Sequence, residues 1–137
     1  MDQNLKDVTD AELAVLQSLW DEGPATIRQL ADALYPGGTD AGYATVQKLL
    51  ERLEDKSHVH RDRSGHAHRF CAVTTRDQLV GQRLRAMAEK LCGGMMAPLL
   101  SHLVRAEALS QEEREELRQL MDQLDRKPRG KDRDKGR

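Results

Sequence analysis

Residues 43–56, YATVQKLLERLEDK, have the spacing of an amphipathic helix. Their apolar side chains recur along one narrow helical face, at Val46, Leu49, Leu50 and Leu53. In the first turns, three side chains project away from that face: Thr45, Gln47 and Lys48. The segment therefore predicts a helix from about Tyr43 to Lys56 with one side buried and the other small, polar and exposed.

Two further helices are expected upstream of this one. Thr9 and Glu12 have the spacing of a capping box, and Gly23-Pro24 stops the helix that follows, so the first helix spans Asp10–Glu22. Thr26 is expected to cap a second, short helix that ends before Pro36-Gly37-Gly38. The apolar stripe of this second helix is Ile27, Leu30, Ala31 and Leu34.

The hydrophobic period changes after residue 56. Val59–Arg61 and Ala67–Val73 have the extended character of short strands. Asp62–His66 joins them as a turn, in which Gly65 can adopt a positive φ. Three helices followed by a two-stranded hairpin, all within residues 5–74, are the order of a winged helix-turn-helix.

The second half of the chain is expected to be helical. Thr75 and Gln78 can cap a helix Arg76–Leu91, Pro98 lies near the first turn of a short helix, and the capping box Ser110–Glu113 opens a last one. The apolar side chains of these helices are Val80, Leu84, Met87, Leu91, Met95, Met96, Leu99, Leu100, Leu103, Val104, Leu117, Leu120, Met121 and Leu124.

Three such helices form a marginal core alone, and a second copy of the chain is the simplest partner. The predicted fold is mainly α with a small β-hairpin wing, a winged helix-turn-helix, plus a C-terminal three-helix dimerisation region. We expect a DNA-binding domain at 5–74, a dimerisation domain at 75–125 and a basic tail at 126–137. The dimerisation residues are Leu84, Met87, Leu91, Leu99, Leu100, Leu103, Leu117, Leu120, Met121 and Leu124.

Composition narrows the class of protein. The 137 residues are 38% hydrophobic and 33% charged, with a formal net charge of −1. No apolar run could span a bilayer, and residues 1–7 lack the apolar core of a signal peptide, so we expect a cytoplasmic protein without membrane insertion. Cys71 and Cys92 form no CxxC pair, which predicts neither a disulfide framework nor a cysteine-rich zinc site.

The last twelve residues form a basic tail, and the sequence contains no enzyme motif. Residues 126–137 contain seven Lys or Arg, two Asp and no apolar residue, which predicts a disordered tail that serves either solubility or non-specific phosphate binding. There is no GxSxG, Walker loop, GxGxxG or HExxH, and no pair of carboxylates with a supporting His. We therefore expect no catalysis, no cofactor and no metal.

The polar side of helix 43–56 suits the major groove of DNA. Gln47 can pair with adenine, Lys48 can reach guanine or phosphate, and the Thr45 methyl can touch thymine. Glu51, Glu54 and Asp55 favour the alternative of a solvated face, but the order of helices and hairpin favours DNA. The expected DNA-binding residues are Tyr43, Ala44, Thr45, Gln47, Lys48, Arg52, Arg63, Ser64 and His66, with Lys56, Arg61 and Arg69 as further cations.

Two other functions stay open. Winged helices also bind proteins, and a near-neutral charge fits a protein-interaction module. Four histidines lie in or beside the hairpin and could bind a divalent metal with Cys71 nearby, as in a metal-responsive sensor. The alternative is that they are exposed wing residues that face phosphate or water, since no metal-ligand spacing motif is complete. These histidines are His58, His60, His66 and His68.

The chain resembles the BlaI/MecI/CopY penicillinase-repressor family over nearly all of Leu5–Leu124. The resemblance is carried by TDAE at 9–12, VL at 15–16, LW at 19–20, GP at 23–24, ATVQKLLERL at 44–53, GHAHRF at 65–70, CGGMMAPLLSHLV at 92–104 and LSQEE at 109–113. The order and spacing of these pieces are specific. The resemblance implies a homodimer that binds a palindromic operator on double-stranded DNA and represses transcription.

The sequence also departs from the family pattern. Ala44-Thr45 stands where a Thr-Thr pair is common, and His66 stands where the wing often has Arg or Lys, which makes it a weaker and pH-dependent phosphate partner. His102-Leu103 replaces the Asn-Phe bond that is cut in antibiotic-responsive members, and the tail lacks the cysteines of the copper-responsive branch. The resemblance still implies a membrane metallopeptidase sensor as a candidate upstream partner.

Overall fold

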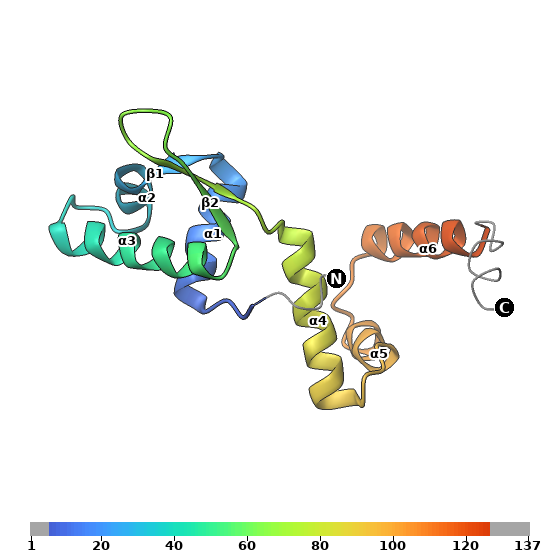
Figure 1. Ribbon diagram of the computed structural model, residues 1–137. Coiled ribbons are helices and arrows are strands. Elements are labelled where there is room, and N and C mark those ends of the chain that lie inside the picture. The colour runs from blue at the N-terminus through green and yellow to red at the C-terminus, as the bar shows by residue number, and fades with distance from the viewer. Residues whose placement is uncertain (1–5, 127–137) are drawn as a thin grey trace, which may run out of the picture. The chain divides into compact units, whose positions relative to one another are not determined.

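The computed structural model describes residues 6–126, which form six α-helices and a three-stranded antiparallel sheet (Figure 1). The chain divides into two compact units, Met1–Ala86 and Met87–Arg137. In chain order the elements are α1 (Asp10–Glu22), β1 (Ala25–Thr26), α2 (Ile27–Leu34), α3 (Asp40–Asp55), β2 (Val59–Asp62), β3 (Arg69–Ala72), α4 (Arg76–Cys92), α5 (Ala97–Arg105) and α6 (Gln111–Arg126).

The expected helix caps are present. The backbone N–H of Glu12 donates to Thr9 Oγ1 at 3.2 Å and the backbone N–H of Thr9 donates to Glu12 Oε1 at 3.0 Å, so the capping box of α1 is complete. Thr26 and Gln29 form the same reciprocal pair at α2. Reciprocal pairs also join Thr75 to Gln78 and Ser110 to Glu113.

The helix expected at Tyr43–Lys56 begins earlier than predicted. Thr39 is its N-cap, because Thr39 Oγ1 accepts a hydrogen bond from the backbone N–H of Gly42 at 3.0 Å, and α3 therefore starts at Asp40. A β-carbon on Gly42 would lie 2.9 Å from Tyr35 Cβ. Glycine at this position therefore lets α3 approach the end of α2 closely.

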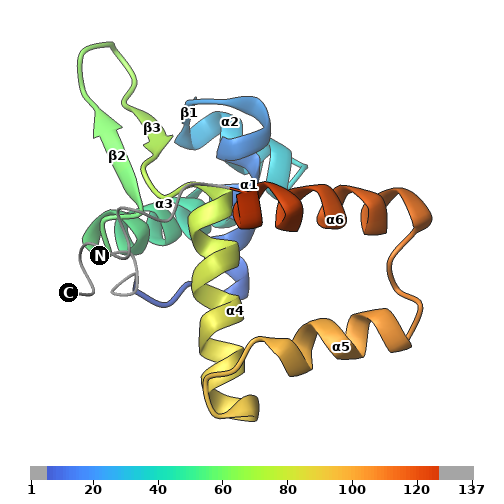
Figure 2. The same cartoon turned by 90° about the vertical axis from the view of Figure 1, so that its right-hand side faces the viewer.

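The sheet contains one strand that the sequence did not reveal. β1 pairs antiparallel with β3, with Ala25 opposite Phe70, so the strand order is β1-β3-β2. The expected hairpin is formed by β2 and β3, with Val59 opposite Ala72, and Figure 2 shows these two strands side by side, joined by a long loop. A strand of two residues has no periodicity, so only the tertiary pairing defines β1.

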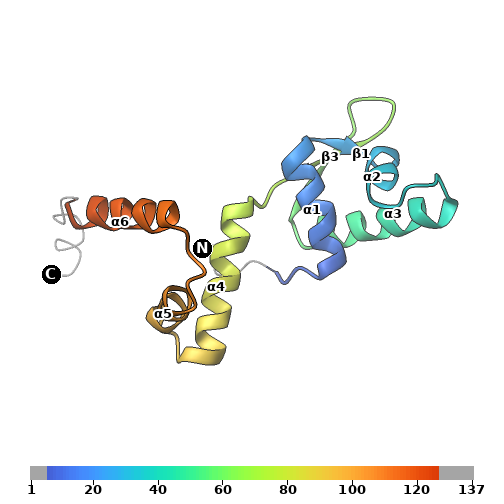
Figure 3. The same ribbon diagram turned by 180° about the vertical axis from the view of Figure 1, so that it is seen from behind.

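The core of the first unit is formed by α1, α2, α3 and the sheet, and Figure 3 shows α1 on the near side of this unit. The Trp20 indole N–H donates to the carbonyl of Thr74 at 2.8 Å and so ties α1 to the segment before α4. Leu79, outside the expected apolar stripe of its helix, is buried in the same cluster. The innermost apolar side chains are Val15, Leu16, Leu30, Val46, Leu50, Leu53 and Phe70.

The second unit is helical and has few buried side chains. No described residue of α5 or α6 is buried. α6 continues to Arg126, the first residue of the expected tail, and the rest of that tail, residues 127–137, lies outside the described residues. Met95 and Met96 precede α5 instead of lying within it. Between residues 6 and 126, no helix is both long and apolar enough to cross a bilayer.

Candidate nucleic-acid interface

The exposed face of α3 carries the residues expected to read bases. Ala44, Thr45, Gln47 and Lys48 are exposed, whereas Val46 is fully buried between them. The fold therefore presents a small side chain, a hydroxyl, an amide and an ammonium group on the second and third turns of α3. The side chains of Gln47 and Lys48 have no hydrogen bond or ion pair with any residue in the described part of the chain and remain available to a ligand.

Thr45 is partly committed to its own helix. Its Oγ1 donates to the carbonyl of Ala41 at 2.9 Å. This bond uses the hydroxyl proton and leaves the methyl group and an oxygen lone pair facing outward. Thr45 can therefore contact a thymine methyl or accept a hydrogen bond, but it cannot donate one without breaking the bond to Ala41.

Tyr43 has a partner that sequence reasoning missed. The guanidinium carbon of Arg28, in the first turn of α2, lies 5.1 Å from the centroid of the Tyr43 ring. Tyr43 is half-buried, and Arg28 is exposed beside the first turn of α3. The pair places a cation, held against an aromatic face, next to the candidate base-reading residues. The contact spans two helices, so no local pattern could have indicated it.

Two of the expected phosphate-binding cations are used by the fold. Arg61 Nη2 donates to Glu54 Oε1 at 2.9 Å, and the Arg61 guanidinium lies 4.9 Å from the centroid of the Phe70 ring. Lys56 Nζ donates to the buried Glu12 carboxylate at 2.7 Å. Arg61 and Lys56, expected as further cations for phosphate, each neutralise a carboxylate of the fold. Arg52 is exposed, and within residues 6–126 no carboxylate pairs with it.

The loop of the hairpin presents the other expected phosphate contacts. Arg63, Ser64 and His66 are all exposed in it. Asp62 Oδ1 accepts a hydrogen bond from the backbone N–H of Ser64 at 2.9 Å. Hydrogen bonds from Ser64 lower the pKa of Asp62, so this carboxylate stays ionised and fixes the turn. Arg69 donates to the carbonyl of Pro24 at 3.2 Å and is turned toward β1.

The hairpin histidines do not form one cluster. His58 is fully buried, with Nδ1 2.7 Å from Thr74 Oγ1 and Nε2 2.8 Å from the carbonyl oxygen of Lys6. His58 and His60 do not share a strand face, since His58 precedes β2 and is buried while His60 lies in β2 and is exposed. Across residues 6–126 there is no group of three or more His, Cys, Asp or Glu side chains that could hold a metal ion.

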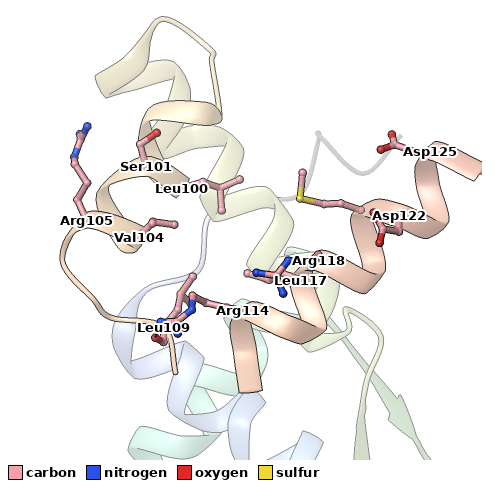
Figure 4. Close-up of a pocket in the computed structure, with 11 residues that line it drawn as sticks. Leu100, Ser101, Val104, Arg105, Leu109, Arg114, Leu117, Arg118, Asp122 and Asp125 are labelled. Carbon is pink, nitrogen blue, oxygen red and sulfur yellow. Dashed lines mark hydrogen bonds between the residues drawn. The ribbon is translucent and has the colours of Figure 1, made fainter. Parts of the chain in front are cut away.

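The second unit presents an apolar surface instead of a polar site. A groove of about 640 Å³ runs between α5 and α6, and its apolar wall includes Leu100, Val104, Leu117 and Met121 (Figure 4). Of the ten residues expected to mediate dimerisation, Leu99 is half-buried in the single chain and the other nine are exposed. The exposed ones are Leu84, Met87, Leu91, Leu100, Leu103, Leu117, Leu120, Met121 and Leu124.

Helices α1 to α3 with the β2–β3 hairpin define a winged-helix protein whose third helix exposes a polar face. Residues 8–123 match the penicillinase repressor family, and the chain belongs to that family. It is 36% identical over 118 residues to the transcriptional regulator BlaI of Mycobacterium tuberculosis, which covers 85% of this chain and 83% of that protein. The predicted family and the prediction of a regulator in place of an enzyme are therefore confirmed.

Solved structures give two further likenesses. A MarR family protein from Bacillus stearothermophilus superposes with a TM-score of 0.46 at 20% identity, over 91% of this chain and 81% of its own. A transcriptional regulator from Thermotoga maritima gives a TM-score of 0.42 at 22% identity, over 88% of this chain and 81% of its own.

Proposed function

We propose that the protein is a transcriptional repressor that binds as a homodimer to two inverted half-sites of double-stranded DNA. The observation that carries this proposal is the exposed polar face of α3 at Thr45, Gln47 and Lys48, on a winged-helix unit. Residues 5–74 then bind DNA and residues 75–125 pair the subunits. A cytoplasmic location belongs to the same proposal.

The base-reading set lies on the second and third turns of α3. Ala44 is small enough to let the helix approach the floor of the major groove. Gln47 can form two hydrogen bonds with adenine, and Lys48 can reach guanine or a phosphate. The methyl group of Thr45 suits a thymine contact, because its hydroxyl already donates to Ala41. Tyr43 lies at the edge of this set, against Arg28.

We expect phosphate contacts from two places beside the base-reading residues. Arg52 extends from the exposed side of α3, and Arg63, Ser64 and His66 extend from the hairpin loop. Contacts of this kind fix the register of the protein on the duplex but carry no sequence information themselves. The acidic residues Glu51 and Asp55, in the later turns of α3, suit a helix end that leaves the groove.

The dimer proposal rests on the apolar side chains of the second unit. In a stable protein, side chains such as Leu103, Leu120 and Leu124 are not left in water along consecutive helices. A second copy supplies an identical apolar surface, and two-fold symmetry matches it to an inverted repeat on DNA. Control by a membrane metallopeptidase sensor stays a prediction from the family resemblance.

The direct test is an electrophoretic mobility shift with the DNA upstream of the protein's own coding sequence. A scrambled duplex of equal length and composition is the matched control. We expect a discrete complex with the upstream DNA that persists at a salt concentration where the scrambled duplex is released. Equal binding of both duplexes at every salt concentration would overturn the proposal and favour a protein-interaction module.

A further inference from the structure

The N-terminal segment Lys6–Val8 is tied to the rest of its unit by three consecutive backbone carbonyls. The carbonyl of Lys6 lies 2.8 Å from His58 Nε2, and the carbonyl of Asp7 accepts from Lys56 Nζ at 2.9 Å. The carbonyl of Val8 accepts from Arg83 Nη2 at 2.6 Å. We call residues 6–8 the strap. Each of its carbonyls has a different side chain as its partner.

The partners of the strap come from two functionally distinct places. Lys56 is the C-cap of α3 and His58 follows it directly, so both belong to the end of the candidate reading helix. Arg83 lies in α4, the helix that begins in the first unit and whose last residues belong to the second. The strap is therefore a hydrogen-bonded link between the end of α3 and α4.

A second route joins the same two elements. His58 Nδ1 lies 2.7 Å from Thr74 Oγ1, and the carbonyl of His58 accepts from the backbone N–H groups of Val73 and Thr74. Nε2 of His58 faces a carbonyl, which can only accept, so this nitrogen carries a proton. Because His58 is fully buried, its ring position is fixed by the segment before α4 on one side and by the strap on the other.

We infer that the strap and Arg83 fix the orientation of the start of α4 relative to α3, and that this orientation sets the half-site spacing that a dimer accepts. The inference rests on the proposed function. In a symmetric dimer, the distance between two reading helices follows from how each is held relative to the dimerisation helices, and half-site spacing reflects that distance. Arg83 is a positioning residue, since it is not one of the residues proposed to contact DNA.

Arg83 is the residue to change, because it makes the one link of the strap that comes from α4. The Arg83→Met variant keeps an apolar stem and loses the hydrogen bond to Val8. Arg83→Lys can still donate to that carbonyl, and Arg85→Met removes a charge from the same helix without touching the strap. Arg83 is half-buried. Should Arg83→Met fail to fold, Arg83→Gln, which is too short to reach Val8, takes its place.

The experiment measures spacing selectivity. The wild-type protein first selects a half-site from a random duplex pool, and inverted pairs of that half-site are then built with centre-to-centre distances changed one base pair at a time. The wild type should prefer one spacing over its neighbours by about tenfold, as expected for a rigidly spaced dimer. Arg83→Met should flatten this preference to about threefold or less, with single half-site affinity within about twofold of wild type.

The controls separate the possible failures. Arg83→Lys and Arg85→Met should keep the wild-type preference. If Arg83→Met, folded and dimeric, also keeps it, the positioning role is overturned while the proposed repressor function stands. If the wild type binds no inverted pair better than a single half-site, the dimeric function fails, and this inference fails with it.

Discussion

Lys56 Nζ lies 2.7 Å from Glu12 Oε1, and this ion pair joins the end of α3 to the start of α1. The Glu12 side chain is only 1% exposed, whereas that of Lys56 is 27% exposed. Burial by itself raises the pKa of Glu12, but the hydrogen bonds from Lys56 and Thr9 outweigh it, so the pKa lies below its ordinary value of 4.5. The pair therefore stabilises the fold while Glu12 is ionised.

The Lys56→Met variant should be less stable than wild type by about 3 kcal/mol, because it leaves a buried carboxylate without its cation. Urea unfolding at neutral pH measures this loss. Lys48→Met is the matched control, since Lys48 is exposed and has no partner among residues 6–126, and it should unfold as wild type does. A Lys56→Met variant as stable as the control would show that the pair is dispensable.

The same pair predicts a pH dependence with a definite sign. A carboxyl group whose pKa is lowered by folding adds stability above its unfolded value, and that stability is lost as the pH falls through the lower, folded value. The difference in unfolding free energy between wild type and Glu12→Gln should thus be largest above pH 4.5 and should shrink below it. A difference that is constant between pH 7 and pH 3 contradicts this assignment.

Gly42 predicts a steric effect at the start of α3. In Gly42→Ala the new β-carbon would lie 2.9 Å from Tyr35 Cβ, so the turn between α2 and α3 must shift. We expect a loss of roughly 1–3 kcal/mol in unfolding free energy together with weaker DNA binding. In Gly81→Ala the nearest atom is the flexible Arg85 Nη1 at 3.4 Å, so this helical control should be neutral or stabilising. Equal stability of the two variants would refute the close-approach argument.

The left-handed backbone conformation of Ser57 predicts that glycine at this position stabilises the protein. Its φ is 68°, in the left-handed region, and its N–H donates to Glu54 while the N–H of His58 donates to Leu53, as in a Schellman motif. Ser57→Gly should raise the unfolding free energy by about 1 kcal/mol, because glycine adopts this conformation without a steric cost. Ser57→Ala should bring no gain. DNA affinity should be unchanged in both, and an unaltered melting temperature in Ser57→Gly would contradict the prediction.

The proposed dimer surface can be tested by introducing one charged side chain into it. Leu103 and Leu120 are 40% and 49% exposed in the single chain, so a carboxylate there should leave the fold intact and break the contact with a second copy. Leu103→Glu and Leu120→Glu should sediment as monomers and bind the two-site operator about 100-fold more weakly, through lost bivalency. Gln119→Glu, beside Leu120 on α6, should remain dimeric. Intact dimers in both leucine variants would place the interface elsewhere.

Much of the fold could be predicted from local signals. Capping boxes at Thr9 and Ser110 gave the starts of α1 and α6, because the cap is formed by residues three apart. The start of α3 was missed because Thr39 caps it through Gly42, without the acidic or amide side chain that completes a capping box. The strand β1 exists only through its pairing with β3, which lies far along the chain.

The candidate site could likewise be predicted only where local sequence patterns define it. The helical period of α3 correctly separates the exposed Gln47 and Lys48 from the buried Val46. It could not show that Lys56 is used by the fold, since its partner Glu12 lies 44 positions away in the sequence. The burial of His58 likewise depends on Lys6 and Thr74, and neither contact leaves a local pattern.

The most direct test of the central claim is the salt dependence of operator binding by wild type and Lys48→Ala. Lys48 is exposed on the third turn of α3 and is free to contact DNA. We predict that Lys48→Ala binds more weakly and that the slope of log K against log salt falls by about one, as expected for one lost cationic contact. Glu51→Gln, one turn further on, should not lower the slope. An affinity and a slope equal to wild type in Lys48→Ala would contradict the assignment of this face of α3 to DNA.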